Sequence, residues 1–220
     1  MQAPLPKLNI TVDVTIFTVH DGQLQIVLIK RTNEPFKGQW ALPGGYLQEG
    51  ETSAESAERV LRQKAGVSGV YVEQLYTFDS PSRDARGRVV TIAYFALVPV
   101  GKLAFSGSDV QEPTLFSVAK LPLLAFDHSD IIRYAVQRLQ AKLEYTNAVH
   151  SLLPRSFTLS ELQSAYEAIL DRPLDKRNFQ KKFLSLDLIT LTDEMKTGGK
   201  HRPARLYRFK DGHAELKKFF

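Results

Sequence analysis

The sequence of 220 residues contains no cysteine. This absence excludes disulfide bonds, cysteine nucleophiles and metal sites built from thiolates. The sequence also has no run of about 18 to 20 apolar residues, the length that crosses a bilayer as a helix. Its first residues lack the basic stretch, apolar run and cleavage site of a secretory signal. We therefore expect a soluble cytoplasmic protein.

The balance of charges differs between the two parts of the chain. Hydrophobic residues make up 43% of the sequence and charged residues 24%, which is typical of a globular protein. The net charge of +5 arises in residues 151–220, which hold 14 basic and 9 acidic residues, whereas the first 150 residues hold 15 of each. Such an asymmetry favours a polyanionic partner for the basic part, although a solvated basic surface gives the same composition.

The N-terminal two thirds of the chain alternates predicted strands with helices. Apolar and polar residues alternate over residues 10–16, which predicts a half-buried strand. Asp21-Gly22 predicts a hairpin turn into a return strand over residues 26–29. Further strands are predicted over residues 70–78, 89–98 and 113–117. Strands with interspersed helices indicate one domain with a mixed sheet.

Two helices are predicted in the same part of the chain. The first covers residues 52–65, with Gly66 as its C-cap, and follows the segment LPGGY (42–46), which reads as a short buried stretch meeting a glycine turn. Its apolar face is predicted to comprise Ala54, Ala57 and Leu61. The second helix covers residues 129–143 and has an apolar stripe at helical spacing.

A different pattern begins near residue 149. Thr158 followed by Glu161 is a capping box that predicts a helix. Asp175 is a good N-cap for a second helix over residues 176–186, and two short strands are predicted over residues 188–191 and 204–209. Helix, turn, helix and basic hairpin are the plan of a winged helix-turn-helix domain. The predicted domains of this α+β chain are residues 1–148 and 149–220.

The stretch GYLQEGETSAESAERVLRQKAGV resembles the Nudix signature. That signature reads Gly, five residues, Glu, seven residues, Arg-Glu, an aliphatic residue, any residue, Glu-Glu, any residue, Gly and an aliphatic residue. The matching positions in this sequence are Gly45, Glu51, Arg59, Leu61, Gly66 and Val67. An ordinary amphipathic helix after a glycine turn explains the helix but not this joint spacing.

Three glutamates of the signature are missing. In an active Nudix helix they share one face, gather divalent cations and so promote hydrolysis of a diphosphate. The corresponding residues here are Val60, Gln63 and Lys64. An aliphatic side chain, a neutral amide and a cation do not replace three carboxylates. We therefore expect no metal site, no catalytic residue and no required cofactor, and a domain that binds a ligand without hydrolysing it.

Candidate ligand contacts lie on and around this helix. Lys64 places an ammonium group about where metal charge would sit, although a solvent-exposed lysine is an equally good interpretation. Arginines suit phosphates, and aromatic rings stack on bases. Asp127 is interpreted as the N-cap of the second helix. The predicted ligand-binding residues are Arg31, Phe36, Trp40, Gly44, Gly45, Glu51, Arg59, Lys64, Arg83, Arg86, Arg88 and His128.

The helix predicted over residues 176–186 has two unlike faces. Phe179, Phe183 and Leu186 point to one side, and Arg177 and Lys181 point to the other. A face of basic and amide side chains is suited to base edges in a major groove, and a basic wing is suited to phosphates. The predicted DNA-binding residues are Lys176, Arg177, Asn178, Gln180, Lys181, Lys182, Lys200, His201, Arg202 and Arg205. A winged helix used for protein contacts is the alternative.

The combination resembles the Nudix-related transcriptional regulators of NAD metabolism, the NrtR family, over most of the chain. The supporting segments are LPGGYLQEGE, TFDSPSRDARGRVVTIAYFALV, LAFDH and GGKHRPARLYRF. The resemblance implies a Nudix α/β/α sandwich followed by a winged helix-turn-helix. It also implies a homodimeric bacterial repressor of NAD biosynthesis or salvage genes that senses ADP-ribose or a related nucleotide and binds a palindromic operator of double-stranded DNA.

Two other functions are compatible with the residues. One is an active Nudix hydrolase of ADP-ribose-like nucleoside diphosphates that uses Glu49, Glu51 or Glu55, with the basic domain as an accessory. The other is an adaptor that binds proteins, which predicts no salt-sensitive binding to DNA.

Overall fold

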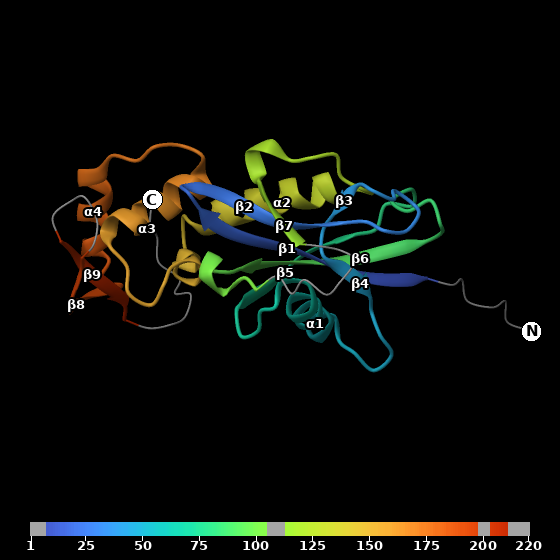
Figure 1. The fold of residues 1–220 in the computed structure, drawn as a ribbon, viewed down its shortest axis with the longest axis horizontal. Coiled ribbons are helices and arrows are strands. Elements are labelled where there is room, and N and C mark those ends of the chain that lie inside the picture. Colours follow the sequence, from blue (N-terminus) through green and yellow to red (C-terminus); the bar gives the residue numbers. More distant parts are fainter. Residues whose placement is uncertain (1–7, 105–112, 198–202, 211–220) are drawn as a thin grey trace, which may run out of the picture.

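The computed structural model describes residues 8–104, 113–197 and 203–210. A large part built around one sheet lies beside a small part that contains two helices and a two-stranded sheet (Figure 1). The large sheet comprises β1 (Asn9–His20), β2 (Gln23–Lys30), β3 (Trp40–Ala41), β4 (Gly44–Tyr46), β5 (Tyr71–Phe78), β6 (Val89–Leu97) and β7 (Pro113–Ser117). In the described ranges, no helix is both long and apolar enough to cross a membrane.

The large sheet is mixed, as the sequence predicts. Its main order is β3-β2-β1-β6-β5, and β7 pairs with β2. The β1–β6 pair is parallel, whereas the other pairs are antiparallel. Strand β1 changes partner along its length, because residues 17–20 pair with β2 while residues 11–13 pair with β4. The sheet therefore splits beside the middle of β1.

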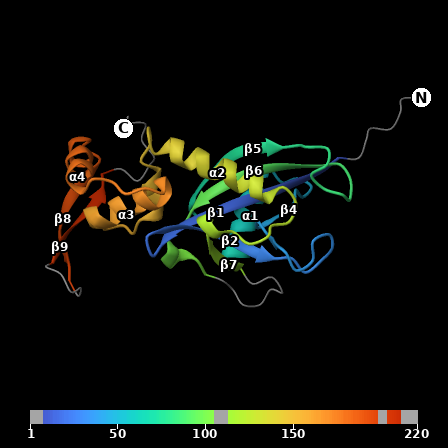
Figure 2. The same ribbon diagram turned by 90° about the horizontal axis from the view of Figure 1, so that it is seen from above.

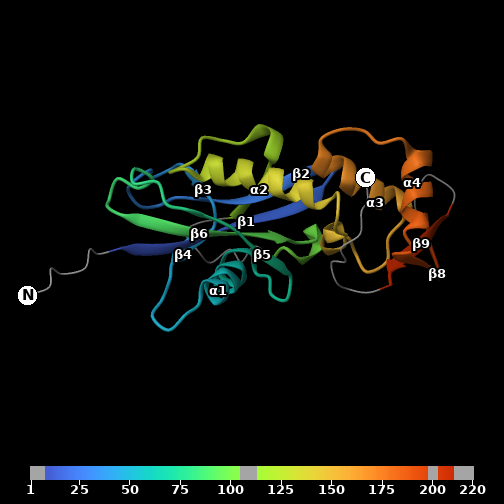
Figure 3. The ribbon, with the colours of Figure 1, turned by 180° about the vertical axis from the view of Figure 1, so that it is seen from behind.

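Two helices cover opposite faces of this sheet (Figure 3). Helix α1 (Ser53–Ala65) begins with a capping box, from Thr52 to Glu55, which sequence reasoning did not identify, and ends at the predicted C-cap Gly66 in the left-handed conformation. Its buried side chains include Ala57 and Leu61 as predicted, but Ala54 is exposed. The apolar face lies further along the helix, and its buried residues are Ser56, Ala57, Val60, Leu61 and Ala65.

Helix α2 (His128–Lys142) covers the other face of the sheet and extends toward the small part (Figure 2). Its buried stripe follows the predicted spacing. Three short 3-10 helices complete this part of the chain: η1 (Val100–Lys102), η2 (Val118–Lys120) and η3 (Ala148–Leu152). The last of these leads directly into the small part.

The small part contains α3 (Leu159–Leu170), α4 (Lys176–Ser185), β8 (Ile189–Lys196) and β9 (Ala204–Phe209). The predicted capping box from Thr158 to Glu161 is present, and the Asp175 side chain accepts from the Asn178 amide to cap α4. Strand β8 is longer than the predicted residues 188–191. A register shift between Leu191 and Met195 allows pairing with β9 to resume beyond the polar residues.

One hydrophobic core joins the two parts. It contains Phe17 and Leu97 of the large sheet, Leu139 of α2, and Tyr166 and Phe183 of the small part. A hydrogen bond also joins the two parts, since the Gln140 side-chain amide on α2 donates to the Ile169 carbonyl oxygen on α3, at 2.9 Å. The two parts are therefore packed against each other rather than tethered by a loop.

The glycines predicted to form a turn instead form strand β4. Gly44 pairs with Asp13 on β1, and the two strands approach so closely that no side chain fits between them. A Cβ atom added at Gly44 would overlap the Asp13 carboxylate and lie 2.8 Å from the Val12 carbonyl oxygen. The sequence pattern identified the glycines but attributed them to a turn. The structure requires glycine at position 44 because β4 and β1 approach each other closely.

We expect Gly44→Ala to lower the free energy of unfolding by about 2 kcal/mol, because the strands must separate to accept the methyl group. Gly45→Ala is a matched control, since the nearest atom to its added Cβ is Arg59 Nη1 at 3.9 Å, an ordinary contact. Urea unfolding of both variants provides the measurement. Equal stability of the two variants would contradict the close-approach interpretation.

Candidate functional site

A cavity of about 360 Å³ opens at the split in the sheet. Its walls come from β1, the end of β2, β4, the loop before β6 and the start of α2. The lining residues are Thr11, Asp13, Ile29, Arg31, Asn33, Glu34, Ala41, Leu42, Gly44, Gly45, Tyr46, Arg83, Asp84, Arg86, Val89, Phe126 and His128. Six of these, Arg31, Gly44, Gly45, Arg83, Arg86 and His128, are residues that the sequence predicts to bind a ligand.

Arg83 is the most buried of the three arginines in this cavity. Its guanidinium group donates to both carboxylate oxygens of Asp127, at 2.7 and 2.9 Å, and lies 3.6 Å from Asp13 Oδ2. The loop before β6 is thereby joined to the start of α2 and to β1. This ion-pair network holds three walls of the cavity together.

Asp127 is the N-cap residue of α2, as the sequence predicts, but its side chain does not cap the helix. Both oxygens instead accept from Arg83. A bidentate bond to an arginine is stronger than a bond to a backbone amide. A capping rule considers only neighbouring residues, so it cannot take account of an arginine so distant in the sequence.

Arg31 and Arg86 lie against the same aromatic ring. The Arg31 guanidinium carbon is 4.7 Å from the centre of the Phe126 ring, and that of Arg86 is 5.6 Å away. Arg86 also binds the carboxylate of Asp84 at 2.7 Å and holds the pKa of that carboxyl group below its usual value. Burial, with the neighbouring charge of Arg86, lowers the pKa of Arg31. Two cations thus face one cavity around an aromatic side chain.

His128 forms the inner end of the cavity and is buried. Its Nδ1 accepts from the Leu42 amide at 2.9 Å, so the neutral ring carries its proton on Nε2, which lies 3.9 Å from Asp13 Oδ1. Burial is the main cause that lowers the pKa of His128. A neutral histidine at this depth provides a hydrogen-bond donor without an added positive charge.

This burial predicts that stability falls as the pH drops below about 6.5, the pKa of histidine in an unfolded chain. The unfolded chain then binds a proton that the folded protein does not bind until a lower pH, so proton binding lowers the free energy of the unfolded state relative to the folded state. We expect up to about 1.4 kcal/mol per pH unit from this residue between pH 6.5 and its folded pKa. The contribution of His128 to the free energy of unfolding is complete at pH values well above 6.5.

His128→Asn tests this prediction, because an asparagine oxygen can still accept from Leu42 but does not titrate. Urea unfolding between pH 5 and pH 7.5 should then show a shallower dependence on pH. His20→Asn, at the exposed last residue of β1, is the matched control for replacing a histidine with asparagine. The same slope in His128→Asn and the unaltered protein would refute the assignment.

Six other predicted ligand residues do not line this cavity. Trp40 packs edge-on against Phe116 at 4.6 Å between ring centres, and Phe36 packs against Phe126 at 4.9 Å, just behind the cavity wall. Arg88 donates to the Asp79 carbonyl oxygen. The remaining three, Glu51, Arg59 and Lys64, belong to α1 or to the loop before it.

The signature helix does not provide a cation site. Val60 is 2% exposed and packs in the core beneath α1, while Gln63 is exposed. Both oxygens of Glu51 accept from Arg59, at 2.7 and 2.9 Å, and this pair lowers the pKa of Glu51 to about 2. In the part of the chain that the structure describes, no group of three or more acidic or histidine side chains is placed to hold a metal ion. The donor set therefore does not fit the divalent cations of a Nudix hydrolase.

Sequence reasoning missed two central residues of the cavity. Asp13 lies near both Arg83 and His128, and Phe126 lies beneath two arginines. Asp13 has a signal in the sequence, since a carboxylate within an apolar strand needs a buried partner. Phe126 has a positive φ of 55°, which no sequence pattern indicates.

The second candidate surface is the outer face of α4. Phe179 and Phe183 are buried, as predicted, while Arg177, Lys181 and the other basic residues of α4 are exposed. Asn178 is exposed and Gln180 is half-buried. Arg205 is exposed on β9, and so is Arg208, which sequence reasoning did not select. Lys200, His201 and Arg202 lie outside the described residues.

Known families match both parts of this chain. Residues 9–139 match the family described as the NUDIX domain, and residues 149–209 match the family described as the NrtR DNA-binding winged helix domain. A protein of Acinetobacter baylyi, the ADPR responsive transcriptional repressor NtrR, is 43% identical over 209 residues. That alignment covers 93% of this chain and 83% of the relative.

Two solved structures extend the comparison. NrtR of Shewanella oneidensis complexed with a 27mer DNA is 37% identical, with a TM-score of 0.82, over 91% of this chain and 93% of that chain. The Nudix domain of the same protein complexed with ADP ribose is 38% identical, with a TM-score of 0.56, over 61% of this chain and 90% of that chain. The likeness to the DNA complex therefore includes both the large sheet and the small C-terminal part.

Proposed function

This chain belongs to the NrtR family, and we propose on that basis that it is a DNA-binding transcriptional repressor that senses ADP-ribose. The observation that carries the proposal is the exposed basic face of α4 in a chain that also contains an arginine-lined cavity. The regulated genes would be those of NAD biosynthesis or salvage, the protein a homodimer in the bacterial cytoplasm, and the operator a palindrome.

The cavity suits the diphosphate of ADP-ribose better than it suits an uncharged ligand. Arg31 and Arg86 supply forked donors that match phosphate oxygens. Phe126 supplies an apolar surface between them, and the Nε2 proton of His128 is available deeper in the cavity. Contact of Lys64 with the ligand stays a prediction, because this residue does not line the cavity.

In this proposal the domain binds its ligand and does not hydrolyse it. Hydrolysis in this fold class requires carboxylates that hold cations against the diphosphate. Val60 is in the core, and Glu51 is committed to Arg59. These positions support binding without hydrolysis, and the hydrolase alternative would have to use Glu49 or Glu55 instead of Glu51.

Helix α2 provides a route from the cavity to the DNA-binding part. At its first turn, Asp127 holds Arg83, and near its last turn, Gln140 holds the Ile169 carbonyl oxygen on α3. A phosphate that draws Arg83 away from Asp127 would shift the start of α2, and the packed core would transmit that shift to α3 and α4. An effector changes operator affinity only if it binds one arrangement of the protein more tightly than the other.

Selection of bound DNA from a random pool, with and without ADP-ribose, tests the proposed function. We expect a palindromic site to be enriched and ADP-ribose to change its affinity in a gel-shift assay. Affinity should fall steeply with added salt, since each phosphate contact releases counterions. No enrichment of any sequence would refute the DNA-binding role, and an affinity unaffected by saturating ADP-ribose would refute the sensing role.

A further inference from the structure

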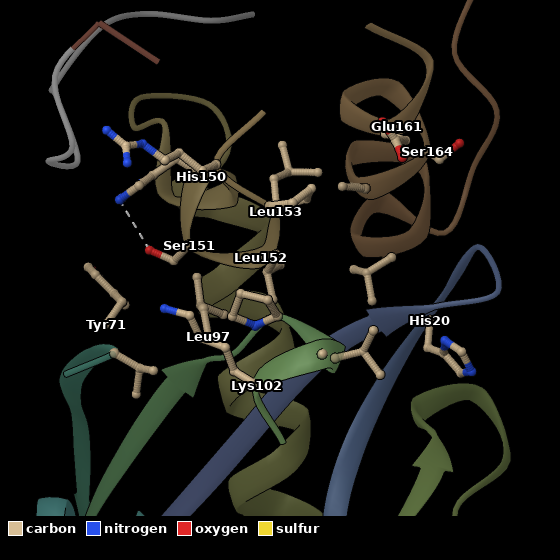
Figure 4. A pocket seen from close by; sticks show the side chains of 18 of the residues that line it. His20, Tyr71, Leu97, Lys102, His150, Ser151, Leu152, Leu153, Glu161 and Ser164 are labelled. Carbon is tan, nitrogen blue, oxygen red and sulfur yellow. Dashed lines mark hydrogen bonds between the residues drawn. The ribbon is translucent and has the colours of Figure 1, made fainter. Parts of the chain in front are cut away.

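A second cavity, of about 1180 Å³, lies between the large sheet and the small part (Figure 4). The β1–β2 turn, the start of β5 and η1 form one wall. Residues 150–155 and helix α3 form the other, with Glu161 and Ser164 facing the space from α3. This interdomain cleft shares no lining residue with the arginine-lined cavity.

The inner surface of the interdomain cleft is apolar and firmly held. Leu97 and Leu152 are buried, and Val19, Tyr71 and Leu153 are half-buried around them. The Tyr71 ring lies 5.9 Å from that of Phe95, and its hydroxyl group donates to Glu73. Glu73 in turn pairs with Lys142 of α2 at 2.9 Å. The cleft therefore contains a preformed apolar surface with an aromatic ring at one side.

The charges around the interdomain cleft are unevenly matched. The Glu161 carboxylate is already used, since it caps α3 and pairs with Lys196 at 2.5 Å. Lys102 and Arg155 are exposed at the rim, and no carboxylate among the described residues lies within ion-pair distance of either. The other lining carboxylate, Asp21, lies 3.4 Å from His20 at the β1–β2 end of the cleft. The charges that an acidic ligand can meet above the apolar floor are therefore those of Lys102 and Arg155.

We propose that the interdomain cleft is a second small-molecule site, which takes an aromatic ring system carrying one acidic group. The rings would lie on the apolar floor against Tyr71, and the acid would reach Lys102 and Arg155. The volume exceeds that of the arginine-lined cavity about threefold, since the two are about 1180 and 360 Å³. Concave apolar surfaces with a few convergent polar groups are the usual form of ligand sites. A molecule held there touches both parts of the chain.

Calorimetry on the full chain with 2-naphthoate as the probe tests this proposal. We expect saturable binding of one molecule per chain at submillimolar concentration, which persists in saturating ADP-ribose because the two cavities share no lining residue. The uncharged analogue 2-naphthalenemethanol should bind at least about 10-fold more weakly, because it lacks the charge that meets Lys102 and Arg155. The Lys102→Ala/Arg155→Ala variant should weaken naphthoate binding by a similar factor.

Ser164→Trp provides a second test, because Ser164 is exposed on α3 and lines the interdomain cleft. The indole should occupy the space and abolish naphthoate binding, while Gln137→Trp, at an exposed position on α2 outside the cleft, should leave it unchanged. Circular dichroism and ADP-ribose affinity verify that both variants are folded. Absence of saturable binding, displacement by ADP-ribose, or full binding by Ser164→Trp would each overturn the proposal.

Discussion

The double variant Arg177→Glu/Lys181→Glu is expected to bind the selected DNA at least about 100-fold more weakly than the unaltered protein. Each side chain lies on the exposed face of α4, opposite the buried Phe179 and Phe183. Loss of one base or phosphate contact in such a helix costs about 1 to 3 kcal/mol, and reversing the charge adds repulsion from the DNA backbone.

A matched control separates this local effect from overall charge. Lys37→Glu/Lys120→Glu makes the same change in net charge at exposed positions on the large part of the chain. We expect this control to retain most of the affinity. The slope of affinity against salt should become shallower by about 2 only in the α4 variant. Similar losses in both variants would mean that net charge, rather than the α4 face, determines binding.

The second large effect is expected in the arginine-lined cavity. Arg31→Ala should weaken ADP-ribose binding by about 10- to 100-fold, since a charge-assisted contact to phosphate contributes about 1.5 to 3 kcal/mol. Arg31 is suited to this test because its guanidinium group contacts the Phe126 ring and donates to carbonyl oxygens of its own loop. Its removal therefore leaves no buried carboxylate without its partner.

Arg88→Ala is the appropriate control for Arg31→Ala. Arg88 is a nearby arginine that does not line the cavity and donates to the Asp79 carbonyl oxygen. Calorimetry should give an ADP-ribose affinity close to that of the unaltered protein. If Arg31→Ala also retains its affinity, the ligand does not lie in this cavity, and the sensing site must be sought elsewhere on the sheet.

Local sequence patterns predicted most of the elements, because the determinants of those elements are themselves local. The capping box at Thr158 and the C-cap at Gly66 both depend on residues within a few positions of each other. The apolar stripes of α2 and α4 follow directly from helical spacing. For the same reason, the buried and exposed faces of α4 could be assigned from the sequence.

The features that sequence reasoning misassigned depend on residues far apart in the chain. The Asp127 carboxylate accepts from Arg83 and makes no capping hydrogen bond to its own helix, and Gly44 is required by the close approach of β1. Half of the predicted ligand residues line the cavity, because the signature locates α1 and the glycines but not the split in the sheet. Asp13 became significant only when its neighbours across the sheet were known.

The continuous core has a consequence for protein engineering. Leu139 of α2 packs in the same cluster as Tyr166 and Phe183, so the hydrophobic surface that supports the small part begins before residue 149. A chimaera that exchanges only residues 149–220 would pair a foreign winged helix with an α2 surface shaped for this one. A functional graft of another DNA specificity onto this sensor must therefore carry α2 with it, or keep α3 and replace only the outer face of α4.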